Sequence, residues 1–543
     1  MAASVQGPEF DSAVAARLLG RGADEVEERL AVLERVHGLV RPVRDHEFPD
    51  GTLSVRYGFV HGLYQNALYA DLPPTRRASW SAAAAQVLLE HWGDKSAAAA
   101  TELALLFEAA RDPARAVDYF QQAARNALGV PAHREAAALA RQGLTLLRQQ
   151  PDTAARAARE LPLLLTLGVS LVATRGFAAP EVEEVYDRAR VLGERAGDVA
   201  GLFPVLYGLW NCYLVRADLT RCDALAREMF ALAQERPNLE RLLIAHNVCQ
   251  QPLFHRGELA AARGHQERGL ALYDPHRHRA LTSVYGEDPG VGCLAYGAVT
   301  RWCLGYPEQA LRSVQAARKL AEELAHPFNV ARALYFGAFT HLCRREPKPT
   351  QELAEALMEL TSEQGFALLV QGGLILQGWS LAEQGRAGEG IAKMREGLAG
   401  WQATGALSHR PYQLALLAQA LAREGEAQEG FTALDEALAL STASGERFLE
   451  AELHRLRGEL FLTQGEADSS VGSAAERCFR SALDVARRQS AKSLELRAAV
   501  SLSRLYRQQG RPAETRPLLA EVHGWFTEGF DTPDLQEAKA LLE

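Results

Sequence analysis

Small residues recur at a fixed interval of forty residues in the second half of this chain. The series consists of Ala298, Ala338, Gly378, Ala418 and Gly458, and Ser503 follows after a slightly longer interval. Two helices can approach closely only where side chains are small, so a regular series of this kind indicates a repeated helix–helix contact. The chain has 543 residues, more than the roughly 250 to 300 that one core supports, and a solenoid that grows by repetition removes this limit.

A predicted turn follows each of these small residues by seven positions. These turns are Gly305-Tyr306, Arg345-Glu346, Gly385-Arg386, Gly425-Glu426, Gly465-Glu466 and Gly510-Arg511, and the same turn occurs earlier at Ala217-Asp218 and Gly257-Glu258. An earlier hairpin turns at Asp112-Pro113, and its second helix carries Ala116, Phe120 and Ala123, the small–large–small series typical of tetratricopeptide (TPR) hairpins. We therefore predict an all-α fold, an α-solenoid of about nine to ten TPR-like hairpins with a forty-residue period. The pairs should form a superhelix with the first helix of each pair, helix A, on the concave face.

Composition agrees with a helical protein and excludes several classes of function. Apolar residues make up 48% of the chain, and a net charge of −9 argues against nucleic acid or an anionic membrane as partners. The seven cysteines include no C-x-x-C pair, as expected of reduced thiols, and we predict no metal site and no cofactor. No targeting segment is recognisable and no run approaches the roughly 18 apolar residues of a membrane span, so we expect a cytoplasmic protein.

The first ninety residues follow a different pattern from the repeats. Two amphipathic helical runs, EFDSAVAARLLG and ADEVEERLAVLERVHG, precede two β-rich runs joined by the turn PDGT, and further helices follow. Helix, helix, hairpin and helix is the order of a winged helix. We predict a winged-helix-like domain with connecting helices over residues 1–92 and the TPR-like array over residues 93–543, with an insertion at 273–290.

Several runs together resemble one known family. They include FDSAVAARLLG, RYGFVHGLYQNALYADLPPTRRA, GLWNCYLVRA, ALYDPHRHR, YGEDPGV, LGYPEQAL and GWSLAEQGRAGEGI, in the family's order over roughly residues 8–465. The chain resembles the C-terminal half of large bacterial signal-transduction ATPases of the STAND class. In these proteins an AAA-type ATPase domain, often fused to a kinase or nucleotide cyclase domain, precedes a winged helix and a TPR-like array.

The sequence departs from this family in lacking the catalytic parts. It contains no G-x-x-x-x-G-K-[ST] phosphate loop, no kinase signature and no G-x-S-x-G or H-E-x-x-H string, so we predict no catalytic residues and no enzymatic activity. The resemblance implies that a winged-helix histidine, here His61, can sense nucleotide phosphates. Without an ATPase domain that role needs a partner chain, and His61 more often simply packs the domain.

Alignment of the A helices on their turns places a set of aromatic and amide side chains toward the concave face. The set comprises Tyr207, Asn211, Asn247, Gln251, Phe254, Trp302, Tyr335, Phe339 and Trp379. Rings supply contact area and amides supply orientation, which suits a peptide or a small effector. The alternative is that these rings pack between repeats. Later helix-A positions, Arg455, Glu459, Arg497, Arg504 and Arg507, suggest a solvated mixed-charge face rather than a phosphate site.

The stretch YDPHRHRALTSVYGEDPG lengthens one repeat by eight residues. Its candidate binding residues are Tyr273, Asp274, His276, His278, Tyr285 and Asp288. The two histidines two residues apart are a weak metal motif, because they cannot close a tetrahedral site by themselves. Asp274-Pro275 and Asp288-Pro289 are also typical helix starts, which favours a structural loop. We predict that the insertion lies over the groove mouth beside Gln251 and Trp302.

The preferred functional hypothesis is a regulatory or scaffold protein that binds a protein, a peptide or a small effector on the concave face. It would be the sensor half of a STAND-type signalling system. The alternatives are a DNA-associated regulator that uses the winged helix and a truncated ATPase that acts with a partner chain. The sequence leaves the oligomeric state open.

Overall fold

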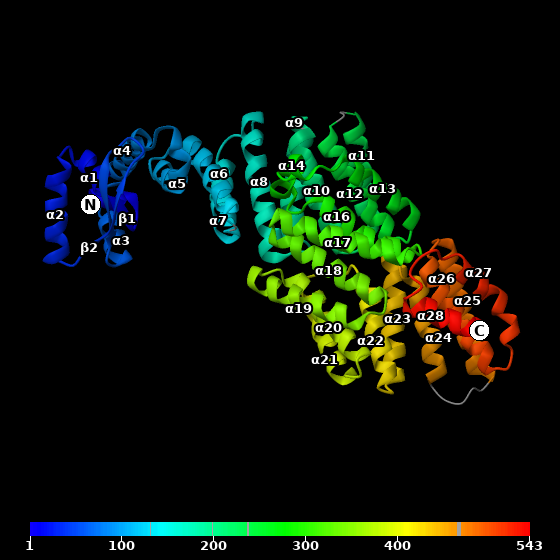
Figure 1. The fold of residues 1–543 in the computed structure, drawn as a ribbon. Coiled ribbons are helices and arrows are strands. Elements are labelled where there is room, and N and C mark those ends of the chain that lie inside the picture. Colours follow the sequence, from blue (N-terminus) through cyan, green and yellow to red (C-terminus); the bar gives the residue numbers. More distant parts are fainter. Residues whose placement is uncertain (131, 198, 236–237, 464–468) are drawn as a thin grey trace. The chain divides into compact units, whose positions relative to one another are not determined.

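The computed structural model describes residues 1–130, 132–197, 199–235, 238–463 and 469–543. The chain forms two compact units (Figure 1). Unit 1 consists of Met1–Thr174 and Arg188–Gly201, and unit 2 consists of Arg175–Asp187 and Leu202–Glu543. The predicted domain division between residues 92 and 93 lies inside unit 1 and stays a prediction.

Unit 1 begins with a small antiparallel sheet and the helices around it. The elements are η1 (Ala2–Gln6), β1 (Glu9–Asp11), α1 (Ser12–Leu19), α2 (Ala23–Arg35), β2 (Val40–Glu47), β3 (Leu53–Phe59), α3 (Gly62–Ala70) and α4 (Pro74–Trp92). The strand order is β1-β3-β2. The β2–β3 hairpin lies where the sequence predicts it, whereas the run expected to be entirely helical from residue 9 starts with strand β1. Phe10 explains the strand, because it is fully buried and stacks on Tyr57 of β3 at 5.8 Å.

The rest of unit 1 is helical. It contains η2 (Gly93–Ala99), α5 (Ala100–Ala109), α6 (Pro113–Gly129), α7 (His133–Arg148), α8 (Ala154–Arg175) and the later part of α9 (Pro180–Ala196). The α5–α6 hairpin turns at the predicted place, and the Asp112 side chain caps α6 by accepting a hydrogen bond from the Arg115 amide at 3.0 Å. Ala116, Phe120 and Ala123 are buried along α6, as their spacing predicts.

Helix α8 is, within the described ranges, the one helix long and apolar enough to cross a membrane by length and composition. We predicted no run of this length and apolar character from the sequence. Half of the apolar window is buried inside the protein, and Glu160 on the same helix pairs with Arg188 of α9 at 2.9 Å. Core helices of this kind meet the same length and composition criteria, so the helix is weak evidence for a membrane span.

Unit 2 is an α-solenoid of paired, TPR-like helices. The A helices are α10 (Val199–Val215), α12 (Leu239–His255), α16 (Pro289–Cys303), α18 (Pro327–Cys343), α20 (Ala367–Glu383), α22 (Arg410–Arg423), α24 (Glu450–Thr463) and α26 (Lys492–Gln508). The B helices are α11 (Leu219–Glu235), α13 (Leu259–Leu272), α17 (Pro307–Leu324), α19 (Pro347–Gln364), α21 (Ala387–Ala403), α23 (Ala427–Ser444), α25 (Ser469–Arg488) and α27 (Arg516–Gly524). The remaining elements are α14 (Pro275–His278) and α15 (Leu281–Tyr285) in the insertion, η3 (Pro512–Glu514), and the C-terminal α28 (Pro533–Leu542). Figure 1 shows partners such as α20 and α21 packed side by side.

The turns between helices A and B share one backbone conformation. The first turn residue has a positive φ at Ala217, Gly257, Gly305, Arg345, Gly385, Gly425 and Gly510, and the predicted turn at Gly465-Glu466 lies outside the described residues. Glycine tolerates this left-handed conformation best and commonly ends a helix in it. The amide of the second turn residue then donates to a carbonyl in the last turn of helix A. At the end of α12, for example, the Glu258 amide donates to the Leu253 carbonyl at 2.9 Å.

The series of small residues marks the contact between the helices of a pair, as the sequence predicts. All six members are buried. A Cβ atom added at Gly378 would lie 2.6 Å from the carbonyl oxygen of Gly390 on the partner helix. A Cβ atom at Gly458 would lie 2.4 Å from the Phe479 ring. Glycine is therefore required at Gly378 and Gly458, because the partner helix occupies the space that a side chain would need.

Helix A of one superhelical turn meets the helix A that lies five pairs later. The amides of Leu407 and Ser408, just before α22, donate to the Val215 carbonyl at the end of α10 at 2.9 and 3.0 Å. The amides of Arg447 and Phe448, just before α24, donate to the His255 carbonyl at the end of α12 at 2.6 and 3.2 Å. We call these and the following two bonds the inter-turn contacts.

Two side chains of α26 continue the inter-turn contacts. Ser493 Oγ donates to the Trp302 carbonyl at 2.6 Å, and Arg497 Nη2 donates to the Cys343 carbonyl at 2.5 Å. The segment after α27 adds a further bond, because Glu528 Oε1 accepts from the amide of Gln309 at 2.9 Å. One superhelical turn therefore rests directly on the next.

The interior enclosed by these contacts is filled with side chains. The ring centroids of Phe254 on α12 and Phe448 are 4.4 Å apart, and those of Tyr335 on α18 and His409 are 6.2 Å apart. One continuous buried cluster runs from Phe254 to Leu494. The inner face is thus a core over much of its length.

Replacement of Gly378 by alanine should destabilise the protein, because the new methyl group would overlap the Gly390 carbonyl. Overpacking of this kind costs about 1–3 kcal/mol. Urea unfolding followed by circular dichroism measures the change. Gly388→Ala is the matched control, since a Cβ atom at this exposed α21 position meets nothing within 4 Å. The free energy of unfolding of the control should rise by up to about 1 kcal/mol. Equal effects of the two substitutions would refute the close contact at Gly378.

Candidate functional site

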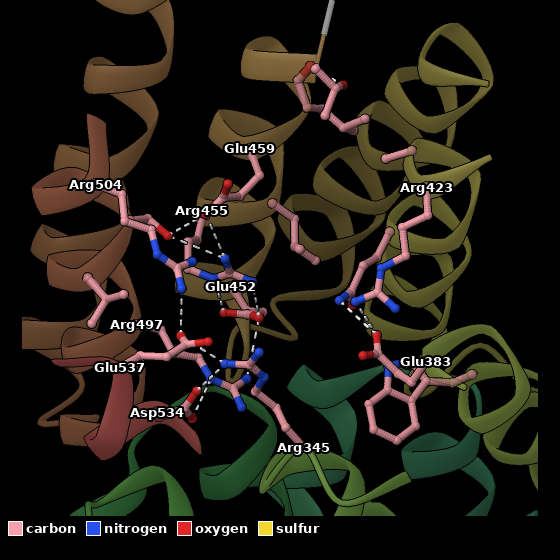
Figure 2. Close-up of a pocket in the computed structure, with 18 of the residues that line it drawn as sticks. Arg345, Glu383, Arg423, Glu452, Arg455, Glu459, Arg497, Arg504, Asp534 and Glu537 are labelled. Atoms are coloured by element: carbon pink, nitrogen blue, oxygen red, sulfur yellow. Dashed lines mark hydrogen bonds and ion pairs between the residues drawn. The ribbon is translucent and has the colours of Figure 1, made fainter. Parts of the chain in front are cut away.

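A polar cavity of about 360 Å³ opens in unit 2 near the C-terminal end of the array. Its walls come from α20, α22, α24, α26 and α28 and from the end of α18 (Figure 2). Five arginines and five carboxylates line it: Arg345, Arg423, Arg455, Arg497, Arg504, Glu383, Glu452, Glu459, Asp534 and Glu537. Equal numbers of positive and negative groups therefore face one cavity.

Glu452 on α24 is the centre of the ion-pair network. Arg455 holds its carboxylate with two nitrogens, Nη2 at 2.7 Å and Nε at 2.8 Å. Arg497 Nη1 approaches the same carboxylate at 3.4 Å. The Glu452 side chain is only 6% exposed, so this buried charge depends on both guanidinium groups.

Helix α28 supplies two further carboxylates. Asp534 accepts from Arg497 Nε at 2.8 Å and from Arg345 Nη1 at 3.2 Å. Glu537 pairs with Arg345 at 3.0 Å and with Arg504 at 2.9 Å. These pairs tie the C-terminal helix to the ends of α18 and α26. Figure 2 shows them on one side of the cavity.

A separate pair lies on the opposite side of the cavity (Figure 2). Arg423 on α22 bonds Glu383 on α20 at 2.7 Å, and Gln419 donates to the same carboxylate at 3.2 Å. The Arg423 side chain is 41% exposed. Arg423 is therefore accessible to solvent, whereas the Glu452 side chain is buried.

The network fixes the charge states of its members. Burial alone would raise the pKa of Glu452, but Arg455 and Arg497 outweigh it and lower this pKa to about 2. Burial alone would lower the pKa of Arg497, but Asp534 and Glu452 outweigh it and raise this pKa above the ordinary value. Groups held permanently charged at neutral pH suit binding and orientation rather than proton transfer.

Apolar side chains complete the cavity between the charged groups. Trp379, Tyr412, Leu456, Leu460 and Val500 lie among the lining residues. An apolar surface surrounded by a few fixed polar groups is the usual make-up of a ligand pocket. The cavity can therefore take an apolar side chain together with charged neighbours.

The residues predicted for the concave face are all buried. Phe254, Tyr335 and Phe339 belong to the interior cluster, as the alternative interpretation holds. The guanidinium carbon of Arg497 lies over the Trp302 ring, 4.8 Å from the ring centroid. Trp379 is the one member of the predicted set that lines the cavity. A second group, Tyr207, Asn211, Asn247 and Gln251, lies on α10 and α12 near the insertion.

The insertion is a structured loop with two short helices. Asp274 caps α14 by accepting from the amides of His276 and Arg277, and Asp288 caps α16 by accepting from those of Gly290 and Val291. The helix-start interpretation of both Asp-Pro pairs is thus confirmed. Tyr273 donates to Asp288 at 2.9 Å, and the His278 ring accepts from the Asp274 amide at 3.0 Å, whereas His276 is exposed.

The insertion does not lie beside Trp302. Its Tyr285 packs against Tyr207 at 4.9 Å, and Glu287 meets Arg332, which also bonds Gln251 at 3.4 Å. Trp302 stands at the other end of α16, and a helix rises about 1.5 Å per residue, so some 20 Å separate it from the loop. The prediction of a position near Gln251 agrees with this geometry, and that near Trp302 was wrong.

His61 is exposed in unit 1, immediately before α3. Its ring meets Tyr64 at 5.6 Å in an edge-on contact. The nucleotide-sensing role that the resemblance implies stays a prediction.

Neither cysteine nor metal chemistry is indicated in the described part of the chain. It contains no group of three or more His, Cys, Asp or Glu side chains that could hold a metal ion. All seven cysteines are free thiols, and burial raises the pKa of Cys249 and Cys293 to about 12. Such thiols are unreactive at neutral pH.

Several cavity residues, among them Arg455, Glu459, Arg497 and Arg504, were predicted to form a solvated mixed-charge face. The forty-residue period could have indicated the cavity, because many of its residues lie at fixed distances after the small residues of the series. One position after them are Trp379, Gln419, Glu459 and Arg504, and five positions after them are Glu383, Arg423 and Thr463. Positions four apart lie on one helix face. Asp534 and Glu537 follow no repeat position, so nothing in the period could have indicated them.

Comparisons with known proteins give distant likeness to solved structures. No family model and no curated protein matches the chain. A Rap protein complexed with competence and sporulation factor shares 11% identity over 74% of this chain and 99% of its own, with a TM-score of 0.46. The Cut9–Hcn1 hetero-tetramer of the APC/C shares 13% identity over 88% of this chain and 85% of its own, with a TM-score of 0.44. A STAND protein with a tetratricopeptide repeat sensor from Pyrococcus horikoshii shares 12% identity over 87% of this chain and 75% of its own, with a TM-score of 0.34.

Replacement of Glu452 by glutamine should lower the free energy of unfolding by about 3–5 kcal/mol, because Arg455 and Arg497 would lose their shared buried carboxylate. Equilibrium denaturation at pH 7 measures the loss. Glu389→Gln, at an exposed pair with Arg386, is the control and should cost less than about 1 kcal/mol.

The same variant should alter the pH dependence of stability. The pKa of Glu452 in the folded protein, about 2, lies below its ordinary value of 4.5, so its contribution is full above pH 4.5 and is lost as the pH falls toward 2. The wild-type protein should therefore lose more stability than Glu452→Gln between pH 5 and pH 3, a range set by this shift. Parallel pH profiles would contradict the ion-pair network.

Proposed function

We propose that this chain is a regulatory or scaffold protein without enzymatic activity, and that unit 2 binds a protein or peptide segment at the cavity of Figure 2. The observation that carries the proposal is the balance of charges in a cavity whose lining also includes apolar side chains. A segment with an apolar side chain between an acidic and a basic one matches such a surface.

The charge balance also selects against other ligands. A phosphate group or a nucleic acid needs excess positive charge, whereas each arginine in this cavity already faces a carboxylate. A peptide can exchange one protein ion pair for two pairs with its own charges. The pair of Arg423 and Glu383 is the natural place for that exchange, since the Arg423 side chain is 41% exposed.

We further propose that residues 1–92 form a winged-helix-like domain that couples the array to a partner protein, as in the sensor half of a STAND system. The strand order β1-β3-β2, with α1 and α2 between β1 and β2, supports this assignment. Helix α2 carries Asp24 and Glu25 in its first turn and further acidic residues along it, which favours a protein over DNA as the partner.

Selection from a displayed peptide library tests the proposal directly. We expect enriched peptides to combine an acidic and a basic residue around an apolar one. Their affinity for full-length Arg423→Glu should fall at least about tenfold, or about 1.4 kcal/mol, because the variant places a like charge beside Glu383. Fluorescence anisotropy measures this affinity.

Arg318→Glu serves as the control, since Arg318 is an exposed arginine on the B helix α17, outside the cavity. It should bind the selected peptides as the wild-type protein does. Failure to enrich any peptide, or equal binding by Arg423→Glu, would refute a peptide site at the cavity.

A further inference from the structure

A second polar cluster lies on the inner face of unit 2, at the opposite end from the cavity. The carboxylate of Glu287, carried by the insertion between α15 and α16, reaches side chains of three A helices. It pairs with Arg332 of α18, accepts a hydrogen bond from the Tyr207 hydroxyl of α10, and lies 3.5 Å from Asn247 Nδ2 of α12. The residue is 3% exposed.

The helices present this carboxylate with a preformed set of donors. The guanidinium carbon of Arg332 lies over two adjacent rings, 5.4 Å from the centroid of Tyr296 and 5.9 Å from that of Phe336, and Arg332 Nη2 donates to Gln251 Oε1 at 3.4 Å. A guanidinium, a phenol and an amide converging from rigid elements form a carboxylate-binding site.

The site offers more donors than Glu287 uses. Arg332 Nε and Gln251 Nε2 are buried in the structure without a hydrogen-bond partner. A buried donor without a partner costs about 1–3 kcal/mol. A site that served only to anchor the loop would not need these donors, whereas a ligand with additional acceptor atoms would satisfy them.

The element that delivers Glu287 is separable from the solenoid. It belongs to the stretch that lengthens one repeat beyond the forty-residue period. Gly286, directly before Glu287, has a φ of 78°, and the neighbouring Ser283 and Val284 are exposed. Local opening costs least at exposed residues such as these, because they contribute few buried contacts.

We propose that Tyr207, Asn247, Gln251 and Arg332 form a binding site for the carboxylate of a peptide ligand, and that Glu287 occupies it as an internal substitute until the ligand displaces it. The carboxylate can be an acidic side chain or a free C-terminus. This site is separate from the cavity around Glu452, so the two proposals can fail independently.

Three small probes distinguish the sources of the carboxylate. N-acetyl-glutamic acid α-amide carries only a side-chain carboxylate, N-acetyl-glutamine carries only an α-carboxylate, and N-acetyl-glutamine amide carries none. Isothermal titration measures their affinities for the full-length wild-type protein, Glu287→Gln, and the double variant Glu287→Gln/Arg332→Gln. Arg423→Glu, in the other cavity, is the control for site identity.

We expect Glu287→Gln to bind at least one carboxylate probe about tenfold more tightly than the wild-type protein, because an internal competitor lowers apparent affinity by the fraction of sites that it fills. The double variant should lose this binding, and Arg423→Glu should not change it. Lack of binding by Glu287→Gln, equal binding of the probe without a carboxylate, or retained binding by the double variant would overturn the proposal.

Proteolysis of the wild-type loop gives a second test in case the variants fold poorly. Arg277 and Arg279 are exposed in the insertion and are trypsin sites. Displacement of Glu287 should increase the rate of cleavage there severalfold when a carboxylate probe is present, and the probe without a carboxylate should have no effect. An unchanged rate with saturating carboxylate probe would contradict displacement.

Discussion

The rest of unit 2 depends on the hydrogen bonds between successive superhelical turns. The last carbonyls of a helix have no partner within it, and a buried carbonyl without a partner is costly. At the ends of α10 and α12 the missing donors are backbone amides that precede α22 and α24. At the end of α18 the donor is Arg497, whose positive charge also suits the negative end of the helix dipole. Sequence-distant repeats are thereby fixed against one another.

This closure determines where a ligand can bind. The inter-turn contacts bring Phe448 and His409 against Phe254 and Tyr335, so the inner face is a core and not an open groove through most of unit 2. Clusters of polar side chains remain at two places in unit 2. The ion pairs of α28 surround the cavity at one end, and the insertion with Glu287 covers the inner face at the other. Both places combine fixed arginines with carboxylates from a late or inserted segment.

Local features of the fold could be predicted from the sequence, whereas long-range ones could not. The forty-residue series predicted Gly378 and Gly458 as close contacts, and the recurring dipeptides predicted the turns at Gly257 and Gly305, because both features depend on neighbouring helices alone. The burial of Phe254 depends on contact with Phe448, five pairs later, and Asp534 pairs with Arg345, which follows the distant helix α18. No local pattern records the number of repeats in a superhelical turn, so these residues were assigned to an open face or missed.

Hydrogen–deuterium exchange at the inter-turn amides tests the central claim most directly. Leu407, Ser408, Arg447 and Phe448 precede their helices and would exchange rapidly in an open solenoid, since the first amides of a helix have no partner within it. Because each donates to a carbonyl of the preceding turn, we expect all four to be protected by a factor of at least about 100, comparable to amides inside α22. Mass spectrometry of short peptides that cover residues 404–410 and 445–450 measures this protection. Exchange at the rate of unprotected chain would show that the turns do not close on one another.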